Sequence, residues 1–229
     1  MLRIYRVFGG TKAPHPLAIA DTAALLAAGA LALLPTETVY GVGVAVSAYK
    51  GHARELPPEG SGYRRIFSLK QRDLAQTVPW LVGGEEDLAR FGEGVGDGAR
   101  ALARAFWPGA LTIVVRASAA VPAFLQAADG TVALRASASP VVRELVRACG
   151  SPLAVTSANT HGAPAPASFE QVEPRILAGV DVAIDAGATA CRDASTIVSF
   201  VSGEPQIIRA GALPPAHIES VLSTSSKAR

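Results

Sequence analysis

The sequence predicts an α/β fold with a single twisted mixed sheet flanked by helices. Short apolar segments rich in Val, Ile and Leu recur along the chain, as expected for buried strands. Between several of them lie segments whose apolar residues recur at helical spacing, as in Pro140 to Arg147. Strands mixed with helices are typical of a layered α/β domain in which some neighbouring strands run antiparallel.

The elements follow from these runs and from the turn residues between them. The expected strands are Arg3 to Phe8, Ala30 to Leu34, Leu111 to Arg116, Thr131 to Arg135, Leu153 to Thr156, Val182 to Ile184, Ser195 to Phe200 and Gln206 to Arg209. The expected helices are Leu17 to Ala28, Tyr63 to Leu69, Asp97 to Phe106, Pro140 to Cys149 and Phe169 to Leu177. Ser139 is the expected N-cap of the helix Pro140 to Cys149. Turn-rich surface excursions are expected at His52 to Gly62 and, around one short helix, at Gly83 to Gly98.

The whole chain is expected to form one domain, residues 1–222, with a flexible tail at 223–229. Its 229 residues are 49% hydrophobic and 17% charged, which excludes a disordered chain. A net charge of +2 is too small for wholesale nucleic-acid binding. The 18 residues from Leu17 to Leu34 are nearly all apolar, but Asp21 and Gly29 interrupt them, so a helix and a strand are expected instead of a membrane span. Two cysteines fit a cytosolic protein.

The run Pro35 to Gly43 is the first candidate site. It follows a predicted buried strand, and open α/β sheets usually bind ligands just beyond such strands. Pro35 suits the end of the strand because it lacks an amide hydrogen. Thr36 and Thr38 supply hydroxyls, and the glycines allow close approach of the backbone. From these residues alone, a ligand site and an ordinary turn are supported about equally.

Four further patches place hydroxyls and cations near the ends of predicted elements. They are Lys70 with Arg72, Thr131 with Arg135, Ser157 with Asn159, and Ser195 with Arg209. Two of them have a plainer interpretation. The cluster Arg64, Arg65, Lys70 and Arg72 can be a solvated helix face, and the Ser157–Asn159 patch a helix cap or Asx turn. The turn Trp107 to Thr112 is better explained by packing. Together the patches predict one anion-binding cleft.

Several common mechanisms lack their motifs. Gly41-Val42-Gly43 has Val46 where the dinucleotide fingerprint needs its third glycine, and the chain contains no Walker loop. Ser157 is not part of a Gly-x-Ser-x-Gly elbow, so a hydrolase triad with His161 is not supported.

In order along the chain, six motifs resemble the YrdC-like family of threonylcarbamoyl-adenylate synthases, from about Ala18 to Leu213. They are Pro-Thr-Glu-Thr-Val-Tyr-Gly, Lys-x-Arg, Trp-Pro-Gly-x-Leu-Thr, Ser-Ala-Asn-x-x-Gly, Ser-Thr and Arg-x-Gly. The resemblance implies a single domain with a concave basic cleft. It also implies synthesis of threonylcarbamoyl-adenylate from threonine, bicarbonate and ATP with Mg²⁺, and release of pyrophosphate. The product would feed a threonylcarbamoyl transferase that modifies tRNA.

The resemblance also implies roles for residues. Thr36, Arg135, Ser157 and Ser195 would surround threonine and its carbamate. The nucleotide side would be lined by Lys70, Arg72, Thr131, Asn159 and Arg209, with Lys70 and Arg72 as the catalytic cations.

The chain departs from the family pattern at three positions. Asp73 follows Lys-x-Arg where proline is usual, Ser137 replaces the proline of Arg-x-Pro, and Ala165 stands where a serine is common. Two alternatives therefore stay open. One is a paralogue acting on a different carbamoyl substrate, and the other is a non-catalytic regulatory module with weak binding to tRNA or double-stranded RNA.

Overall fold

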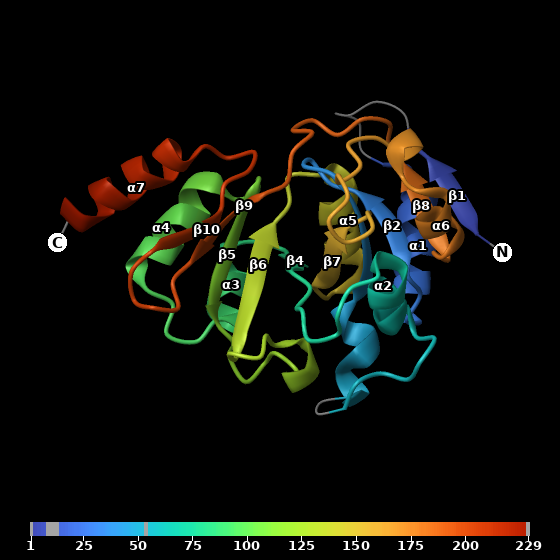
Figure 1. The fold of residues 1–229 in the computed structure, drawn as a ribbon, viewed down its shortest axis with the longest axis horizontal. Coiled ribbons are helices and arrows are strands. Elements are labelled where there is room, and N and C mark those ends of the chain that lie inside the picture. Colours follow the sequence, from blue (N-terminus) through green and yellow to red (C-terminus); the bar gives the residue numbers. More distant parts are fainter. Residues whose placement is uncertain (1, 8–13, 53–54, 228–229) are drawn as a thin grey trace.

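The computed structural model describes residues 2–7, 14–52 and 55–227. They form one ten-stranded mixed sheet in the order β1-β8-β2-β3-β7-β4-β6-β5-β9-β10. Figure 1 shows the sheet running across the molecule, with β1 near the N-terminus at one end and α7 near the C-terminus at the other. The predicted α/β class with a single mixed sheet is confirmed.

All eight predicted strands are present, with small shifts at their ends. Two more, β3 and β4, were not predicted, because β3 contains two glycines and β4 is only three residues long. The strands are β1 (Arg3–Arg6), β2 (Ala32–Pro35), β3 (Tyr40–Ala45), β4 (Trp80–Val82), β5 (Leu111–Arg116), β6 (Thr131–Ala136), β7 (Leu153–Ser157), β8 (Val182–Asp185), β9 (Thr196–Ser199) and β10 (Gln206–Arg209).

The helices largely match the prediction, and α4 and α5 match it at both ends. The α-helices are α1 (Pro16–Ala27), α2 (Gly62–Lys70), α3 (Glu85–Phe91), α4 (Asp97–Phe106), α5 (Pro140–Cys149), α6 (Pro174–Ala178) and α7 (Pro215–Lys227). Three 3₁₀ segments are η1 (Val46–His52), η2 (Ala123–Leu125) and η3 (Phe169–Gln171). None of the helices within the described ranges is both long and apolar enough to cross a membrane.

Three expectations about the helices need correction. The single helix expected at Phe169 to Leu177 is split into η3 and α6, because Pro174 begins a new helix. The tail expected from Ser223 overlaps the end of α7, which continues as far as Lys227, and residues 228–229 lie outside the described part of the chain. Ser139 occupies the N-cap position of α5, but its hydroxyl donates to the carbonyl oxygen of Pro35 (2.8 Å) and caps no amide.

The glycines of β3 allow β7 to lie unusually close. A Cβ atom placed on Gly43 would be 2.5 Å from the Ala154 carbonyl oxygen and 2.5 Å from the Val155 side chain. One on Gly41 would be 2.6 Å from Val155. Since β3 and β7 are paired from Gly41–Ser157 to Ala45–Leu153, these glycines bring the Pro35–Gly43 run beside Ser157.

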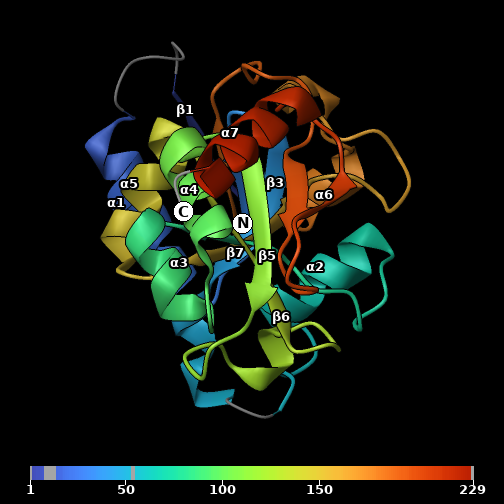
Figure 2. The same ribbon diagram turned by 90° about the vertical axis from the view of Figure 1, so that its left-hand side faces the viewer.

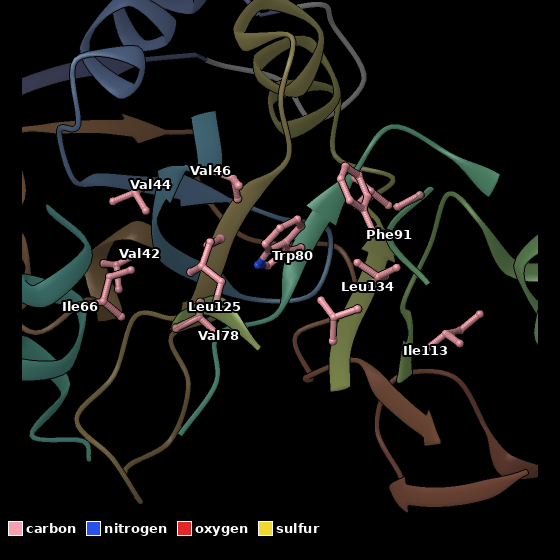
Figure 3. Packing of buried hydrophobic residues seen from close by; sticks show 14 of the residues in the cluster. Val42, Val44, Val46, Ile66, Val78, Trp80, Phe91, Ile113, Leu125 and Leu134 are labelled. Atoms are coloured by element: carbon pink, nitrogen blue, oxygen red, sulfur yellow. The ribbon is translucent and has the colours of Figure 1, made fainter. Parts of the chain in front are cut away.

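The two faces of the sheet are buried differently. Trp80, Ile113, Leu134 and Val42 point into the larger core, with Trp80 near its centre (Figure 3). A smaller core packs α1 and α5 against the other face. Figure 2 shows α1 and α5 on one side of the sheet and α2 and α6 on the other.

On the face that carries α1 and α5, the helices do not cover β5, β6 and β9. The alternate residues Val114, Ala133 and Ile197 there are only half-buried, whereas their neighbours Ile113 and Leu134 are fully buried. This face of the sheet is therefore accessible next to the ends of β3 and β7.

Candidate active site

A cavity of about 110 Å³ lies on this accessible face. It brings together five of the predicted site residues from four separate parts of the chain, namely Thr36, Arg135, Ser157, Ser195 and Arg209. Thr38, Tyr40, Thr112 and Thr156 also line it. Thr38 and Tyr40 belong to the predicted Pro35–Gly43 run, whereas Thr112 and Thr156 were not predicted as site residues. Because whole-ligand sites usually measure about 300–1,000 Å³, the enclosed part suits only one end of a larger ligand.

Arg135 is held in place by Glu37 and by the Gly109 carbonyl oxygen. Its Nη2 lies 2.6 Å from Oε1 of Glu37, and its Nε–H donates to the Gly109 carbonyl oxygen (3.1 Å). The Ser137 hydroxyl donates to the other carboxylate oxygen of Glu37. Burial would raise the pKa of Glu37, but the Arg135 charge and the Ser137 hydrogen bond outweigh burial, so its pKa lies below the usual value. The pair is therefore charged at neutral pH.

The Trp107–Thr112 turn contributes to this arrangement. Trp107 donates its indole N–H to the Leu111 carbonyl oxygen (2.7 Å), which fixes the turn, and Gly109 presents the carbonyl that Arg135 contacts. The turn therefore does more than the packing that was expected of it.

Thr36 forms the core of a tight turn after β2. Its Oγ1 accepts from the amides of Thr38 and Val39 (both 3.1 Å) and donates to the Val39 carbonyl oxygen (2.6 Å). Thr36 also lines a second, larger cavity of about 680 Å³, as does Glu37. The Thr36–Glu37 segment therefore lies between the two cavities.

Lys70, at the end of α2, anchors the loop after β7. Its Nζ donates to the carbonyl oxygens of Ser157 and Asn159 (2.8 Å for the latter) and to the Asn159 side chain (3.2 Å). Burial, reinforced by the nearby Arg72 charge, lowers the pKa of Lys70 to about 8. Lys70, Ser157 and Asn159 thus form one connected group, although the resemblance assigned Ser157 to the threonine side and the other two to the nucleotide side.

Arg72 lies beside this group. Gln71 adopts a left-handed conformation (φ 52°), so the chain turns back directly after α2. The Arg72 guanidinium donates to Thr156 Oγ1 (3.3 Å), to the Thr77 carbonyl oxygen and to Gln76 (both 2.6 Å). Burial lowers the pKa of Arg72 from its ordinary value.

Arg209 comes from the opposite end of the sheet. It donates to the Ser195 carbonyl oxygen (2.7 Å) and the Ser195 hydroxyl (3.3 Å), and that hydroxyl lies 2.8 Å from the hydroxyl of Thr112. Burial and the charge of Arg135 lower the pKa of Arg209. The two arginines are thus close enough to repel each other.

The balance of charge in the site is uneven. Arg135 is neutralised by Glu37, whereas Lys70, Arg72 and Arg209 form no ion pair within 4 Å with any carboxylate in the described parts of the chain. Their partners are carbonyl, amide and hydroxyl oxygens. Cations kept together without counter-charges are suited to binding a polyanion.

Four predicted site residues do not line the cavity, namely Lys70, Arg72, Asn159 and Thr131, and Asp73 lies apart from it as well. Thr131 is at the start of β6, four residues before Arg135, and donates to Asp129 (2.7 Å). Asp73 is exposed and accepts from the Ala75 amide (2.9 Å), so its carboxylate supports the turn that follows Lys70 and Arg72.

The basic cluster predicted as one patch is dispersed. Arg64 lies 3.5 Å from Glu59, Arg65 pairs with Asp181, and Lys70 is buried beneath the loop after β7. Of the four, only Lys70 and Arg72 contact the Thr156–Asn159 segment.

The contributions of Glu37 and Thr112 were missed. Both lie inside motifs that the sequence singled out, but their contacts join residues 98 and 83 positions apart, which local patterns do not reveal. No group of three or more His, Cys, Asp or Glu side chains placed to hold a metal occurs among the residues that the structure describes.

The chain is similar in sequence and fold to known proteins over most of its length. The family whose model matches residues 24–211 is described as "Telomere recombination" and comprises Sua5, YciO and YrdC proteins. A Mycobacterium tuberculosis (strain H37Rv) relative is 36% identical over 208 residues, covering 91% of this chain and 90% of its own length. A Chromohalobacter salexigens relative named "Threonylcarbamoyl-AMP synthase" is 32% identical over 186 residues, covering 81% and 94%.

Solved structures agree with the sequence relatives. The structure of Pyrococcus abyssi Sua5 complexed with L-threonine superposes with a TM-score of 0.82 at 28% identity. The match covers 96% of this chain and 60% of that one. Since the family model spans most of the chain and relatives above 30% identity match nearly end to end, the chain belongs to the Sua5/YciO/YrdC family.

Proposed function

We propose that this chain synthesises L-threonylcarbamoyl-adenylate from L-threonine, bicarbonate and ATP, with release of pyrophosphate. One observation carries the proposal: Lys70, Arg72 and Arg209 have only neutral partners among the described residues. Arg209 lines the small cavity that also holds the neutralised Arg135, and Lys70 and Arg72 contact Ser157 and Thr156 of its lining. Such a site suits a polyphosphate at its rim and a small polar molecule inside. The names of the sequence relatives support the same reaction.

The chemistry explains why cations are needed. The amine of threonine adds to bicarbonate and water leaves, giving a carbamate. A carbamate oxygen then forms a bond to the α-phosphorus of ATP, and the bond from that phosphorus to the bridging oxygen of pyrophosphate breaks. Two anions must approach each other in this step, so fixed cations and hydroxyl donors lower its barrier by offsetting their repulsion and aligning the reactants.

The proposed roles follow the two regions of the site. Thr36, Arg135, Ser157 and Ser195 would hold threonine and its carbamate in and beside the cavity. Lys70 and Arg72 would stabilise charge on the α-phosphate and on the departing pyrophosphate, together with Arg209 and Asn159. Thr131 stays a predicted nucleotide contact. At the usual rise per residue it lies about 13 Å along β6 from Arg135, so only an extended part of the nucleotide would reach it.

Mg²⁺ is proposed as a companion of ATP. Magnesium bound to nucleotides is commonly held by phosphate oxygens, water and one or two carboxylates. The phosphates that Lys70 and Arg72 would contact would therefore supply its main ligands, and the ion would offset part of their negative charge.

The proposal is tested by measuring pyrophosphate release from purified protein with ATP and Mg²⁺. We expect release that depends on both threonine and bicarbonate, and a product with the mass of threonylcarbamoyl-adenylate. Replacing threonine by serine, valine or glycine separates this activity from that of a paralogue with a different substrate. Absence of release with every amino acid would contradict the proposal.

The alternative of a non-catalytic RNA-binding module is less well supported, because the basic cluster that motivated it is dispersed. It predicts RNA binding with a steep salt dependence and no ATP binding. Contact with tRNA, delivery of the product to a threonylcarbamoyl transferase and a cytosolic location stay predictions.

A further inference from the structure

The ion pair between Glu37 and Arg135 is tied to a residue that departs from the family pattern. Ser137, buried and only 1% exposed, stands where the Arg-x-Pro motif has proline. Its hydroxyl donates to Oε2 of Glu37 while Oε1 lies 2.6 Å from Arg135. Proline has no hydroxyl and could not make this contact.

The backbone of Glu37 is fixed as well. Its carbonyl oxygen accepts from the Cys191 amide (2.8 Å), and the preceding residue, Thr36, is locked by the turn described above. With both the backbone and the far carboxylate oxygen held, the carboxylate offers Arg135 a single position.

Arg135 retains donors for a ligand. A guanidinium carries five N–H groups, and its contacts within the described residues engage only the Nε–H and Nη2. Because Arg135 lines the cavity, its remaining N–H groups can receive a carboxylate, which arginine binds most strongly when both groups are aligned in one plane.

We propose that Glu37 and Ser137 are positioning residues: they set the orientation of the Arg135 guanidinium, and so the affinity of the site for the amino-acid substrate. This inference rests on the proposed function. Glu37 also cancels the charge of Arg135, so that this end of the site favours an amino acid with both an amine and a carboxylate over a second polyanion.

The test compares steady-state constants for threonine and for ATP in three variants. In Glu37→Gln the charge is removed at nearly constant volume. In Ser137→Ala the donor to Glu37 is lost, together with the acceptor of a hydrogen bond from the Ser139 amide (3.2 Å). Ser139→Ala is the matched control, since Ser139 is also buried and its hydroxyl donates to the Pro35 carbonyl, but it does not touch Glu37. Melting temperatures are measured for all three.

We expect the threonine KM to rise at least about tenfold in Glu37→Gln and by about threefold to tenfold in Ser137→Ala, with the ATP KM unchanged within about twofold. Ser139→Ala should lower the melting temperature about as much as Ser137→Ala and leave both KM values unchanged. A merely structural role would instead change the KM values of threonine and ATP by similar factors, or would change the threonine KM equally in Ser137→Ala and Ser139→Ala.

The two proposals fail in different ways. If the unaltered protein releases no pyrophosphate with threonine, bicarbonate and ATP, the proposed function is wrong and the positioning role falls with it. If the unaltered protein is active and the threonine KM of both Glu37→Gln and Ser137→Ala equals that of the unaltered protein, only the positioning role is wrong.

Discussion

At the scale of single residues, the site depends on where charge is compensated and where it is not. Glu37 neutralises Arg135 at one end, while Lys70 at the other contacts only oxygens of the loop after β7. No carboxylate among the described residues pairs with Lys70 to offset its burial, so burial lowers the pKa of Lys70 to about 8. Because of this difference, we expect ligand binding at the Arg135 end and at the Lys70 end of the site to respond differently to pH and to mutation.

The lowered pKa of Lys70 predicts loss of ATP use at alkaline pH. Only the protonated amine attracts phosphate, so kcat/KM for ATP should fall as the pH rises through about 8. The titration of Lys70 would not cause this fall by unfolding the protein. Because the pKa of Lys70 is lower in the folded than in the unfolded state, its titration increases the free energy of unfolding as the pH rises between those two pKa values. Lys70→Arg should remove the decline near pH 8. A profile that stays level to about pH 10 would contradict the assignment.

Replacing Lys70 or Arg135 by alanine should impair the use of a different substrate in each case. Lys70→Ala and Arg135→Ala should each reduce the rate at least about tenfold, ~1.4 kcal/mol. Lys70→Ala should also raise the ATP KM, and Arg135→Ala the threonine KM. Arg143→Ala, on the outer part of α5, is a suitable control because no ion pair or hydrogen bond involves its side chain within the described chain. Near-normal activity of both truncations would mean that the site is misplaced.

At the scale of elements, the close approach of β3 and β7 brings the motifs together. Gly41 and Gly43 face the Val155 side chain, and β3 carries the Pro35–Gly43 run beside Ser157. Several other motif residues end regular elements: Lys70 ends α2, Ser157 ends β7 and Arg209 ends β10. A rigid sheet can there hold polar side chains beside a ligand. The geometry of the site therefore depends on a pairing that leaves no room for a side chain.

Gly43→Ala is expected to destabilise the protein by ~1–3 kcal/mol, because the new methyl group would overlap the Ala154 carbonyl and Val155. Urea denaturation measures the loss as a lower midpoint. Gly51→Ala is the matched control: its methyl group would meet no atom within 4 Å, so the free energy of unfolding should change by less than ~0.5 kcal/mol. Equal midpoints for Gly43→Ala and the unaltered protein would show that the two strands can separate.

At the scale of the whole molecule, the sequence predicted the class of fold, eight strands and the order of the motifs. Apolar periodicity is a local property, so α4 and α5 could be predicted exactly. The strand β4 was missed because three residues show no period, and the contacts of Glu37 and Thr112 were missed because they depend on which strands become neighbours. The sequence therefore predicted five residues that the structure brings to one cavity, and the topology determined which charged groups became neighbours there.

The same topology makes a prediction about ligand binding. The site joins α2, the strands β3 and β7, and the C-terminal strands β9 and β10, so ATP should stabilise the whole sheet rather than one half. At about 100 times its Kd, ATP should contribute ~2.7 kcal/mol, which for a chain of this size raises the melting temperature by roughly 5–10 °C.

Calorimetry should show a single unfolding transition both with and without ATP, and ATP should raise the melting temperature of that whole transition. At equal ATP concentration, the rise should be smaller in Lys70→Ala. Since β5 lies between β6 and β9, the C-terminal strands cannot leave the sheet without exposing Ile113 and Val198 of the larger core. Two transitions, of which ATP moves only one, would contradict this coupling and show that the two ends of the sheet unfold independently.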